Sequence, residues 1–379
     1  MLYGGRSGEH EVSLASAAAV FANLNRQKYE PVALRIEKDG RWVLADRPPS
    51  AASAADVLDQ TRNDATRLRG GRELILPPRP GEDTVVIVDR RSAEPGDAEV
   101  ATTLTGLRLD AIFPVLHGPY GEDGTIQGLL ELASVPYVGC GVLASAVGMD
   151  KTVMKTVFRA RDLLTPDWVA VTRREWLAGQ KAALASVERA LDYPMFVKPA
   201  NLGSSVGISK VKNTKELIPA IALAAEFDRK VIVEAAVPMA REIECGVLGN
   251  EHAEASVPGE IIPSREFYDY QAKYIDSGSR TEIPAELDER VAREVRRLAI
   301  AAFEAIDGSG LARVDFLLNR VTGELFVNEI NTLPGFTTIS MYSKLWGATG
   351  IDYPTLVDRL VTLALERHAE KRALRTSAF

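Results

Sequence analysis

Residues 325–336, LFVNEINTLPGF, read as an apolar strand that ends in a Pro-Gly turn. Positions two apart in a strand share a face, so the side chains of Glu329 and Asn331 project together. Polar groups at the end of an apolar strand are rarely tolerated unless they are paired or bind an ion. We therefore expect a cation beside this strand end.

A second apolar strand, GLARVDFLLN at residues 310–319, is expected to form a hairpin with the first one. It carries Arg313 and Asp315 on one face. The hairpin would bring Asp315 close to the carboxylate and the amide of the other strand. Hard oxygen ligands of this kind suit Mg²⁺, which completes its coordination with water and substrate phosphates. A polar surface pair is the alternative, which the otherwise continuous apolar character of both strands disfavours.

Composition limits the classes of function to consider. The chain has 379 residues, of which 46% are hydrophobic and 26% charged, enough for two or three domains. A formal charge of −7 without a basic stripe argues against a general nucleic-acid binder or a binder of anionic membranes. Small-molecule chemistry is the better expectation.

Cysteine usage and the N-terminus bear on the compartment. Cys140 and Cys245 both lie among apolar residues and glycines, so we expect buried thiols in a reducing compartment. The N-terminal stretch resembles no signal peptide, and no run of 18 apolar residues occurs. The sequence therefore predicts a cytoplasmic protein without a membrane span.

Along the chain, strands and helices alternate as in α/β proteins. Ser13 is expected to open a helix, and residues 46–100 are rich in Pro, Ala, Asp and Arg, which favours a surface insertion in which only residues 84–88 form a strand. Only MLY precedes the first glycine-rich loop. We expect the first strand to be truncated or missing, with the natural start upstream.

Three lysines are candidates for binding phosphate. Lys198 lies in the apolar strand PMFVKPA, where a buried charge is costly without an anionic partner, so a phosphate partner is expected. Lys151 heads a predicted helix, and Lys273 is flanked by tyrosines in YDYQAKY. Single lysines are usually solvated surface charges, so Lys198 carries the most weight.

The loop NLGSSVGISKV contains Ser204 and Ser205 between glycines. Glycines let backbone N–H groups approach an anion, but an ordinary hairpin turn fits the pattern equally well. The next strand ends near Glu234. The strand after it carries Glu242 in alternation with apolar residues. The alternation is typical of a half-buried strand with a solvent-exposed acidic face. The alternative is that a carboxylate here binds the ribose hydroxyls of a nucleotide, and both interpretations stay open.

Eight stretches resemble, in order, the motifs of the D-alanine:D-alanine ligases of the ATP-grasp superfamily, over nearly the whole chain. They are GGRSGEHEVSL, HGPYGEDGTIQG, MDKTVMK, FVKPANLGSSVGISKV, REIECGVLG, FYDYQAKY, ARVDFLL and NEINTLPGFTTISM. The resemblance implies an α/β fold, with α+β character in the ATP-grasp part. It implies a Rossmann-like N-terminal domain at 1–139 with an insertion near 46–100, a central ATP-grasp lid domain at 140–236 and a C-terminal ATP-grasp catalytic domain at 237–379.

The resemblance also implies how ATP and metal are bound. The nucleotide would be held between the central and C-terminal domains, with Lys273 at the transferred phosphoryl group and the remaining contacts from Lys151, Lys198, Ser205, Glu234 and Glu242. Two Mg²⁺ ions, for which Mn²⁺ can substitute, would bridge the phosphates. Asp315 and Glu329 would take one ion, and Glu329 and Asn331 the other.

By the same resemblance, two D-alanines are joined into D-alanyl-D-alanine, a peptidoglycan precursor, through an acylphosphate. Arg313 and the backbone N–H of Gly335 would stabilise the tetrahedral oxyanion. Glu9, linked to Ser204 and Tyr274, would bind the first ammonium group. Ser340 would bind the second carboxylate, with Met341 beside it, and the family implies a homodimer. His117 is either a hydrogen-bonded core residue or a contact of the first substrate.

Other functions are compatible with the same residues. D-alanine:D-lactate and D-alanine:D-serine ligases share the same machinery, although Tyr274 resembles the dipeptide-forming type. Other ATP-grasp ligases, such as those that make glutathione or carboxylate biotin, share the fold but not the GGRSGEHEVSL and YDYQAKY stretches. A catalytically silent nucleotide-binding scaffold is disfavoured, because every charged position that the chemistry needs is present.

Overall fold

The computed structural model describes residues 1–50, 53, 56–57, 72–81, 84–90, 102–203, 206–262 and 280–375 of the chain. These residues form two compact units. The first comprises 1–142, 335–343 and 351–379, and the second comprises 143–334 and 344–350. The two sheets of the second unit, described below, are compatible with the expected central and C-terminal domains, whose boundaries remain a prediction.

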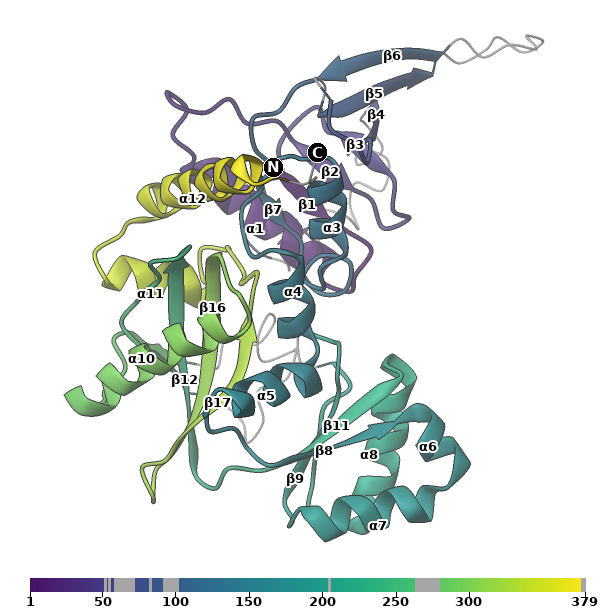
Figure 1. Cartoon of the computed structure of the whole chain (residues 1–379), viewed down its shortest axis with the longest axis vertical. Helices are drawn as coiled ribbons and strands as arrows, with labels where there is room; N and C mark the ends of the chain where they lie inside the picture. Colours follow the sequence, from purple (N-terminus) through teal and green to yellow (C-terminus); the bar gives the residue numbers. More distant parts are fainter. Residues whose placement is uncertain are drawn as a thin grey trace. The chain divides into compact units, whose positions relative to one another are not determined.

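A seven-stranded sheet with the order β6-β5-β4-β3-β2-β1-β7 forms the first unit (Figure 1). Strand β1 runs parallel to β2 and β7, and the other neighbours are antiparallel. Helices α1 and α12 contact each other. The elements are β1 (Leu2–Gly4), α1 (His10–Asn23), β2 (Leu34–Ile36), β3 (Trp42–Leu44), β4 (Arg72–Ile75), β5 (Val85–Arg90), β6 (Thr102–Leu107), β7 (Pro114–Val115), α3 (Thr125–Leu132) and α12 (Tyr353–Ala373).

The first strand is present, although it has only three residues. Its side chains Leu2 and Tyr3 are 0% and 1% exposed, because β1 lies between β2 and β7. The expectation of a missing strand is therefore wrong, and that of a short one is confirmed.

Ser13 does not open the first helix. Helix α1 begins at His10, and Ser13 lies inside it. The Ser13 hydroxyl accepts a hydrogen bond from the N–H of Gly4 (2.7 Å) and donates one to the carbonyl of Val115. A residue typical of helix caps thus joins the ends of β1 and β7.

The predicted insertion contributes more to the sheet than expected. Within 46–100, the sequence predicted one strand at 84–88, and the structure has β5 there and also β4. Strand β4 has the sequence RELI, whose charged first half hides the apolar pattern of a strand.

The second unit contains a four-stranded antiparallel sheet with the order β10-β9-β11-β8. Helices α6, α7 and α8 lie along one side of it (Figure 1), and Trp176, Val187 and Ile221 pack there against Val197 and Val233. The predicted charged helix at 173–191 is divided at residue 179. The elements are β8 (Trp168–Thr172), α6 (Arg173–Ala178), α7 (Gln180–Ala190), β9 (Met195–Pro199), β10 (Ser209–Val211), α8 (Thr214–Phe227) and β11 (Lys230–Ala235).

A second sheet in this unit has the order β15-β14-β12-β16-β17, with β13 paired to β12. Helix α10 contacts β12, β16 and β17, and helix α5 contacts β17. The elements are α4 (Val142–Met149), α5 (Lys151–Ala160), β12 (Ala240–Gly249), β13 (Glu254–Ala255), β14 (Gly259–Ile262), β15 (Arg280–Glu282), α10 (Glu289–Ala305), β16 (Gly310–Asn319), β17 (Leu325–Asn331) and α11 (Met341–Ala348).

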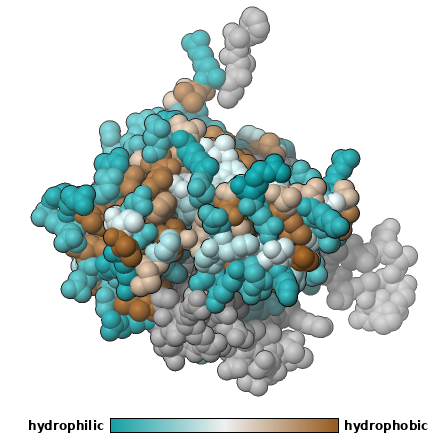
Figure 2. Space-filling view, turned by 90° about the horizontal axis from the view of Figure 1, so that it is seen from below, coloured by the Kyte–Doolittle hydropathy of each residue, from teal (hydrophilic) through white to brown (hydrophobic). Residues whose placement is uncertain are grey.

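Several surface features accord with the composition. On the face drawn in Figure 2, hydrophilic residues surround small apolar areas. Among the described residues, no helix is both long and apolar enough to span a bilayer. Both cysteine thiols are buried, as predicted.

Candidate active site

The hairpin predicted from the sequence is present in the second unit. Strands β16 and β17 are antiparallel neighbours, with Asp315 opposite Glu329 and Arg313 opposite Asn331. The pairing shifts by one residue between Asp315 and the next position of β16. The three predicted metal ligands are thus carried by one pair of adjacent strands.

Arg313 neutralises the acidic side of this hairpin. Its Nε and Nη2 atoms each donate a hydrogen bond of 2.7 Å to Asp315, one to each carboxylate oxygen, and its Nε lies 3.0 Å from Glu244 Oε2. Burial would lower the pKa of Arg313, but the neighbouring carboxylates raise it well above its ordinary value. A predicted metal ligand and a predicted oxyanion stabiliser are therefore joined in one ionic cluster.

Lys151 begins helix α5 as predicted, and Asp150 caps this helix by accepting hydrogen bonds from the N–H groups of residues 152 and 153. The Lys151 ammonium group donates to the carbonyl of Leu202 (2.9 Å) and lies 3.9 Å from Glu329 Oε2. One lysine therefore contacts both the segment that leads into the glycine-serine loop and the predicted metal-binding strand.

Lys198 lies in β9, and its buried ammonium group has a carboxylate partner. Its Nζ atom is 2.5 Å from Glu234 Oε2, so the chain itself supplies the anion that the sequence analysis expected from a phosphate. Burial opposes the charge of Lys198, but Glu234, Glu329 and Glu242 raise its pKa. Burial would likewise raise the pKa of Glu234, but Lys155 and Lys198 lower it to about 2.

Lys155 in helix α5 is a buried charge that was not predicted, with only 1% of its surface exposed. Its Nζ atom lies 3.0 Å from Glu234 Oε1 and donates to the carbonyl of Asn328 (2.8 Å). The signal was present in MDKTVMK, because Lys155 follows Lys151 by four residues and therefore lies on the same helix face.

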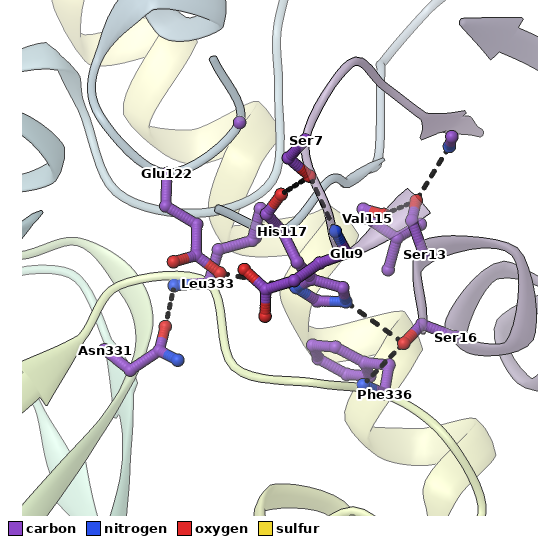
Figure 3. Close-up of polar contacts among 12 residues, drawn as sticks. Ser7, Glu9, Ser13, Ser16, Val115, His117, Glu122, Asn331, Leu333 and Phe336 are labelled. Carbon is purple, nitrogen blue, oxygen red and sulfur yellow. Dashed lines mark hydrogen bonds and ion pairs between the residues drawn. The ribbon is translucent and has the colours of Figure 1, made fainter. Parts of the chain in front are cut away.

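The first unit gathers a second polar cluster around His117 (Figure 3). His117 Nε2 lies 3.1 Å from Ser16 Oγ, and its Nδ1 lies 3.4 Å from Glu122 Oε1. The Ser16 hydroxyl also accepts from the N–H of Phe336 (3.3 Å). Burial, reinforced by the charge of Glu9, raises the pKa of Glu122. His117 is thus a hydrogen-bonded residue next to two acids, of which only Glu9 was predicted.

Glu9 lies against the glycine-rich loop that follows β7. A Cβ atom added to Gly118, whose φ is +73°, would lie only 2.6 Å from Glu9 Oε2. His117 also lines a cavity of about 340 Å³ in this unit, together with Ser7 and Tyr120. The loops that carry Glu9 and His117 are therefore in contact, and the Ser7 hydroxyl also donates a hydrogen bond to the carbonyl of His117 at 2.5 Å.

Gly335 and Ser340 are close together in the first unit. The Ser340 hydroxyl lies 3.0 Å from where a Cβ atom of Gly335 would be, and it bonds the N–H (3.0 Å) and hydroxyl (2.8 Å) groups of Thr337. Met341 follows as the first residue of α11. The predicted second-substrate residues are thus adjacent on one turn.

Glu242 belongs with the lysine cluster, since its charge contributes to the raised pKa of Lys198. Glu242 lies in β12 opposite Leu317 of β16, on the sheet that carries the hairpin. The remaining predicted residues of the glycine-serine loop and of the tyrosine-rich stretch lie outside the described residues: Ser204, Ser205, Lys273 and Tyr274.

The donor set on the hairpin fits a hard divalent cation. Two carboxylates and one amide supply oxygen ligands only, as Mg²⁺ prefers, and leave room for water and phosphate oxygens. In the part of the chain that the structure describes, no three His, Cys, Asp or Glu side chains are grouped to hold a metal by themselves. The three side-chain oxygens of the hairpin fill only part of an octahedral site, which water and phosphate oxygens would complete.

Comparison with known proteins gives the same picture. The family model described as "D-ala D-ala ligase N-terminus" matches residues 1–140, and that described as "D-ala D-ala ligase C-terminus" matches residues 157–362. The chain belongs to the D-alanine–D-alanine ligase family. The resemblance predicted from the sequence motifs is thus confirmed.

Individual members of the D-alanine–D-alanine ligase family match the chain over nearly its full length. The D-alanine–D-alanine ligase of Thermoanaerobacter sp. is 49% identical over 98% of this chain and 97% of its own, and that of Acetivibrio thermocellus is 44% identical over 97% and 96%. The solved D-alanine-D-alanine ligase from Coxiella burnetii has a TM-score of 0.77 at 36% identity, covering 98% of this chain and 94% of its own. The VanG D-Ala:D-Ser ligase from Enterococcus faecalis has a TM-score of 0.78 at 33% identity, covering 96% and 98%. These structures confirm the predicted α/β ATP-grasp architecture.

Proposed function

We propose that this protein ligates two D-alanines to D-alanyl-D-alanine, with hydrolysis of ATP to ADP and phosphate, for peptidoglycan synthesis. The observation that carries the proposal is the joint placement of oxygen donors and lysines in the second unit. Asp315 faces Glu329 across the hairpin, and the ammonium group of Lys151 lies 3.9 Å from Glu329. Such a site can neutralise and orient a triphosphate.

In this proposal, the ammonium groups of Lys151 and Lys198 bind the phosphate groups of ATP. Glu234 fixes Lys198 by a contact of 2.5 Å, so the ammonium group is held in place before the nucleotide arrives. Glu242 on β12 would hold the ribose hydroxyls. By the family resemblance, Lys273 would contact the transferred phosphoryl group, and Ser205 would be a further contact of the nucleotide.

Asp315, Glu329 and Asn331 would hold two Mg²⁺ ions, or Mn²⁺ in their place. When bound, these ions would neutralise phosphate charge as it shifts during transfer. The chain's own contribution is to orient the donors: Arg313 grips both oxygens of Asp315, and Asn331 accepts from the N–H of Leu333 at 2.9 Å.

For the amino-acid substrates, we propose that Glu9 binds the ammonium group of the first D-alanine, with His117 beside it. The carboxylate of this substrate takes the γ-phosphoryl group and becomes an acylphosphate. The amine of the second D-alanine, whose carboxylate Ser340 receives, then attacks the acyl carbon and expels phosphate. Arg313 and the N–H of Gly335 would stabilise the oxyanion of that step.

Closed loops would protect the acylphosphate from water. Ser204 and Tyr274 are assigned to this closure by resemblance, and Met341 to the second-substrate pocket. We further expect a cytoplasmic homodimer. Sedimentation of the purified protein would check the dimeric state.

The test is the product formed from ATP, Mg²⁺ and an equimolar mixture of D-alanine, D-serine and D-lactate, identified by mass spectrometry. We expect D-alanyl-D-alanine to predominate and ADP release to require D-alanine. Predominant D-alanyl-D-serine, the product type of the VanG neighbour, or predominant ester would overturn the choice of second substrate. ADP release without any need for D-alanine would overturn the proposed function as a whole.

A further inference from the structure

Lys155 occupies a position that stability alone does not explain. The side chain is 1% exposed, so its charge has been taken out of water. Buried ion pairs rarely stabilise a fold more than apolar side chains of the same size would. Apolar residues in place of both Lys155 and Glu234 would fill the same space without the cost of desolvation. A lysine here therefore suggests a role in placing its partners.

One partner of Lys155 is a β-bulge in the predicted metal-binding strand. In β17, Val327 pairs with Phe316 and Glu329 pairs with Asp315, which leaves Asn328 as an extra residue. It is the carbonyl of this extra residue that accepts the Lys155 hydrogen bond, at 2.8 Å.

The bulge decides where the next side chains point. In a regular strand, Val327 and Glu329 would share a face, since side chains alternate with a period of two. In the structure, the buried positions are Val327 and Ile330, which are three residues apart. The extra residue thus moves Glu329 and Asn331 off the core face.

The other partner, Glu234, connects Lys155 to the nucleotide side of the site. One carboxylate oxygen of Glu234 lies 3.0 Å from Lys155 and the other 2.5 Å from Lys198. Glu234 therefore holds both ammonium groups in place, and Glu329 and Glu242 add further negative charge near Lys198.

We propose that Lys155 is a positioning residue that fixes the bulge at Asn328 and thereby holds Glu329 and Asn331 in the orientation that binds a divalent cation with the nucleotide. This proposal rests on the proposed function only in assigning the cation to β17. We assign Lys155 no contact with substrate or ion in this proposal. It acts through the carbonyl of Asn328 and the carboxylate of Glu234.

The test compares Lys155→Met with a matched variant, Arg241→Met, in the full-length protein. Arg241 in β12 donates two hydrogen bonds to Glu260, whose side chain is 4% exposed, so its loss also breaks a buried ion pair in the same unit. Strand β12 pairs with β16 and β14, not with β17. Both variants should therefore lower stability, but only Lys155→Met should disturb the bulge at Asn328.

The readout is Mn²⁺ affinity at saturating ADP, measured by electron paramagnetic resonance at a temperature where all proteins are folded. We expect Lys155→Met to weaken Mn²⁺ binding by about tenfold or more, as loss of a group that orients metal ligands does. Arg241→Met should stay within about twofold of the wild type, and Lys155→Arg, which keeps charge and donors, should recover most of the affinity. Unchanged affinity in Lys155→Met, or equal losses in both methionine variants, would overturn the proposal.

A second measurement covers the case in which Lys155→Met does not fold. In protein labelled with ¹⁵N in its lysine side chains, the Nζ resonance of Lys155 is identified as the one that is missing from the spectrum of Lys155→Arg. In the wild type, this resonance should shift when Mg²⁺ is added to the ADP complex. A resonance that does not move overturns the proposal. Failure of the proposed function looks different: a wild type that binds Mn²⁺ with ADP but forms no D-alanyl-D-alanine contradicts the substrates and leaves the role of Lys155 intact.

Discussion

At the scale of single residues, Arg313 has more than one ionic partner. Its planar guanidinium group bonds both oxygens of Asp315 at 2.7 Å and reaches Glu244 at 3.0 Å. A lysine keeps the charge but cannot form this fork, so the two amino acids are not interchangeable here. The geometry of Asp315, and through it the metal site, depends on the fork.

Arg313→Lys is therefore expected to reduce kcat by about 100-fold or more, the size of effect seen when one oxyanion donor is lost. The free energy of unfolding should fall by about 1–3 kcal/mol, because buried acceptors lose their donors. Steady-state kinetics and urea unfolding measure the two effects. A kcat within threefold of the wild type would contradict the role given to Arg313.

The pH dependence of stability follows from Glu234. Burial alone would raise its pKa, but the two lysines lower it from 4.5 to about 2 in the folded protein. A depressed pKa of an acid contributes stability that is complete above the unfolded value and is lost as the pH falls through the folded value.

Glu234→Gln should therefore destabilise the protein most near neutral pH, and the difference from the wild type should shrink as the pH falls from 4.5 towards 2. Urea unfolding at a series of pH values measures this difference. A difference that stays constant over that interval would show that Glu234 is not held as a carboxylate by the lysines.

At the scale of elements, the start of α5 links helix capping to the nucleotide site. Asp150 accepts from the N–H groups of Thr152 and Val153 and lies 2.5 Å from the ammonium group of Lys230. The next residue is Lys151, whose backbone N–H donates to Ala200 at 3.0 Å. The cap therefore sets the place of a phosphate-binding lysine.

Asp150→Ala is expected to cost about 1–2 kcal/mol of unfolding free energy and to weaken ADP binding severalfold. Asp352→Ala is the matched control, because Asp352 caps α12 through the N–H of Thr355 at 2.9 Å. It should lower the free energy of unfolding through loss of the cap and leave ADP affinity unchanged. Calorimetry checks both, and equal ADP affinities for the two variants would contradict the link.

The elements also show what the sequence could and could not predict. Continuous apolar strands predicted the hairpin, and the face shared by Glu329 and Asn331 followed from their spacing of two. The bulge at Asn328 was not predictable, because an extra residue in a strand leaves no periodic signal. Its consequence is that Val327 and Glu329 no longer share a face. Ser13 was wrongly taken as a cap, because the same hydroxyl can bond a helix end or a neighbouring strand. Lys155 was passed over because a lysine is normally solvated.

At the scale of the whole molecule, the predicted site residues fall in two compact units. The first contains Glu9, His117, Gly335 and Ser340, and the second contains the lysines and the metal-binding hairpin. The family resemblance grouped Gly335 and Ser340 with residues 237–379, and no local pattern predicted that these two residues and α12, at the end of the chain, belong to the first unit. Long-range packing of this kind depends on surfaces that are distant in sequence.

Ligand binding should stabilise the protein by mass action, by about 2.7 kcal/mol when the ligand is at 100 times its Kd. We expect ADP with Mg²⁺ to raise the Tm more than ADP with EDTA does. The metal-dependent part of this rise should be absent in Glu329→Ala. Differential scanning fluorimetry measures it, and an identical rise with and without metal in the wild type would argue against a metal on the hairpin.

The most direct measurement is the anomalous diffraction of crystals grown with ADP and Mn²⁺, since Mn²⁺ marks its own position. We predict strong peaks at about 2.1 Å from side-chain oxygens of Asp315, Glu329 and Asn331, close to the distance of an ideal octahedral site. Peaks elsewhere, or ADP bound with no metal on this hairpin, would contradict the account.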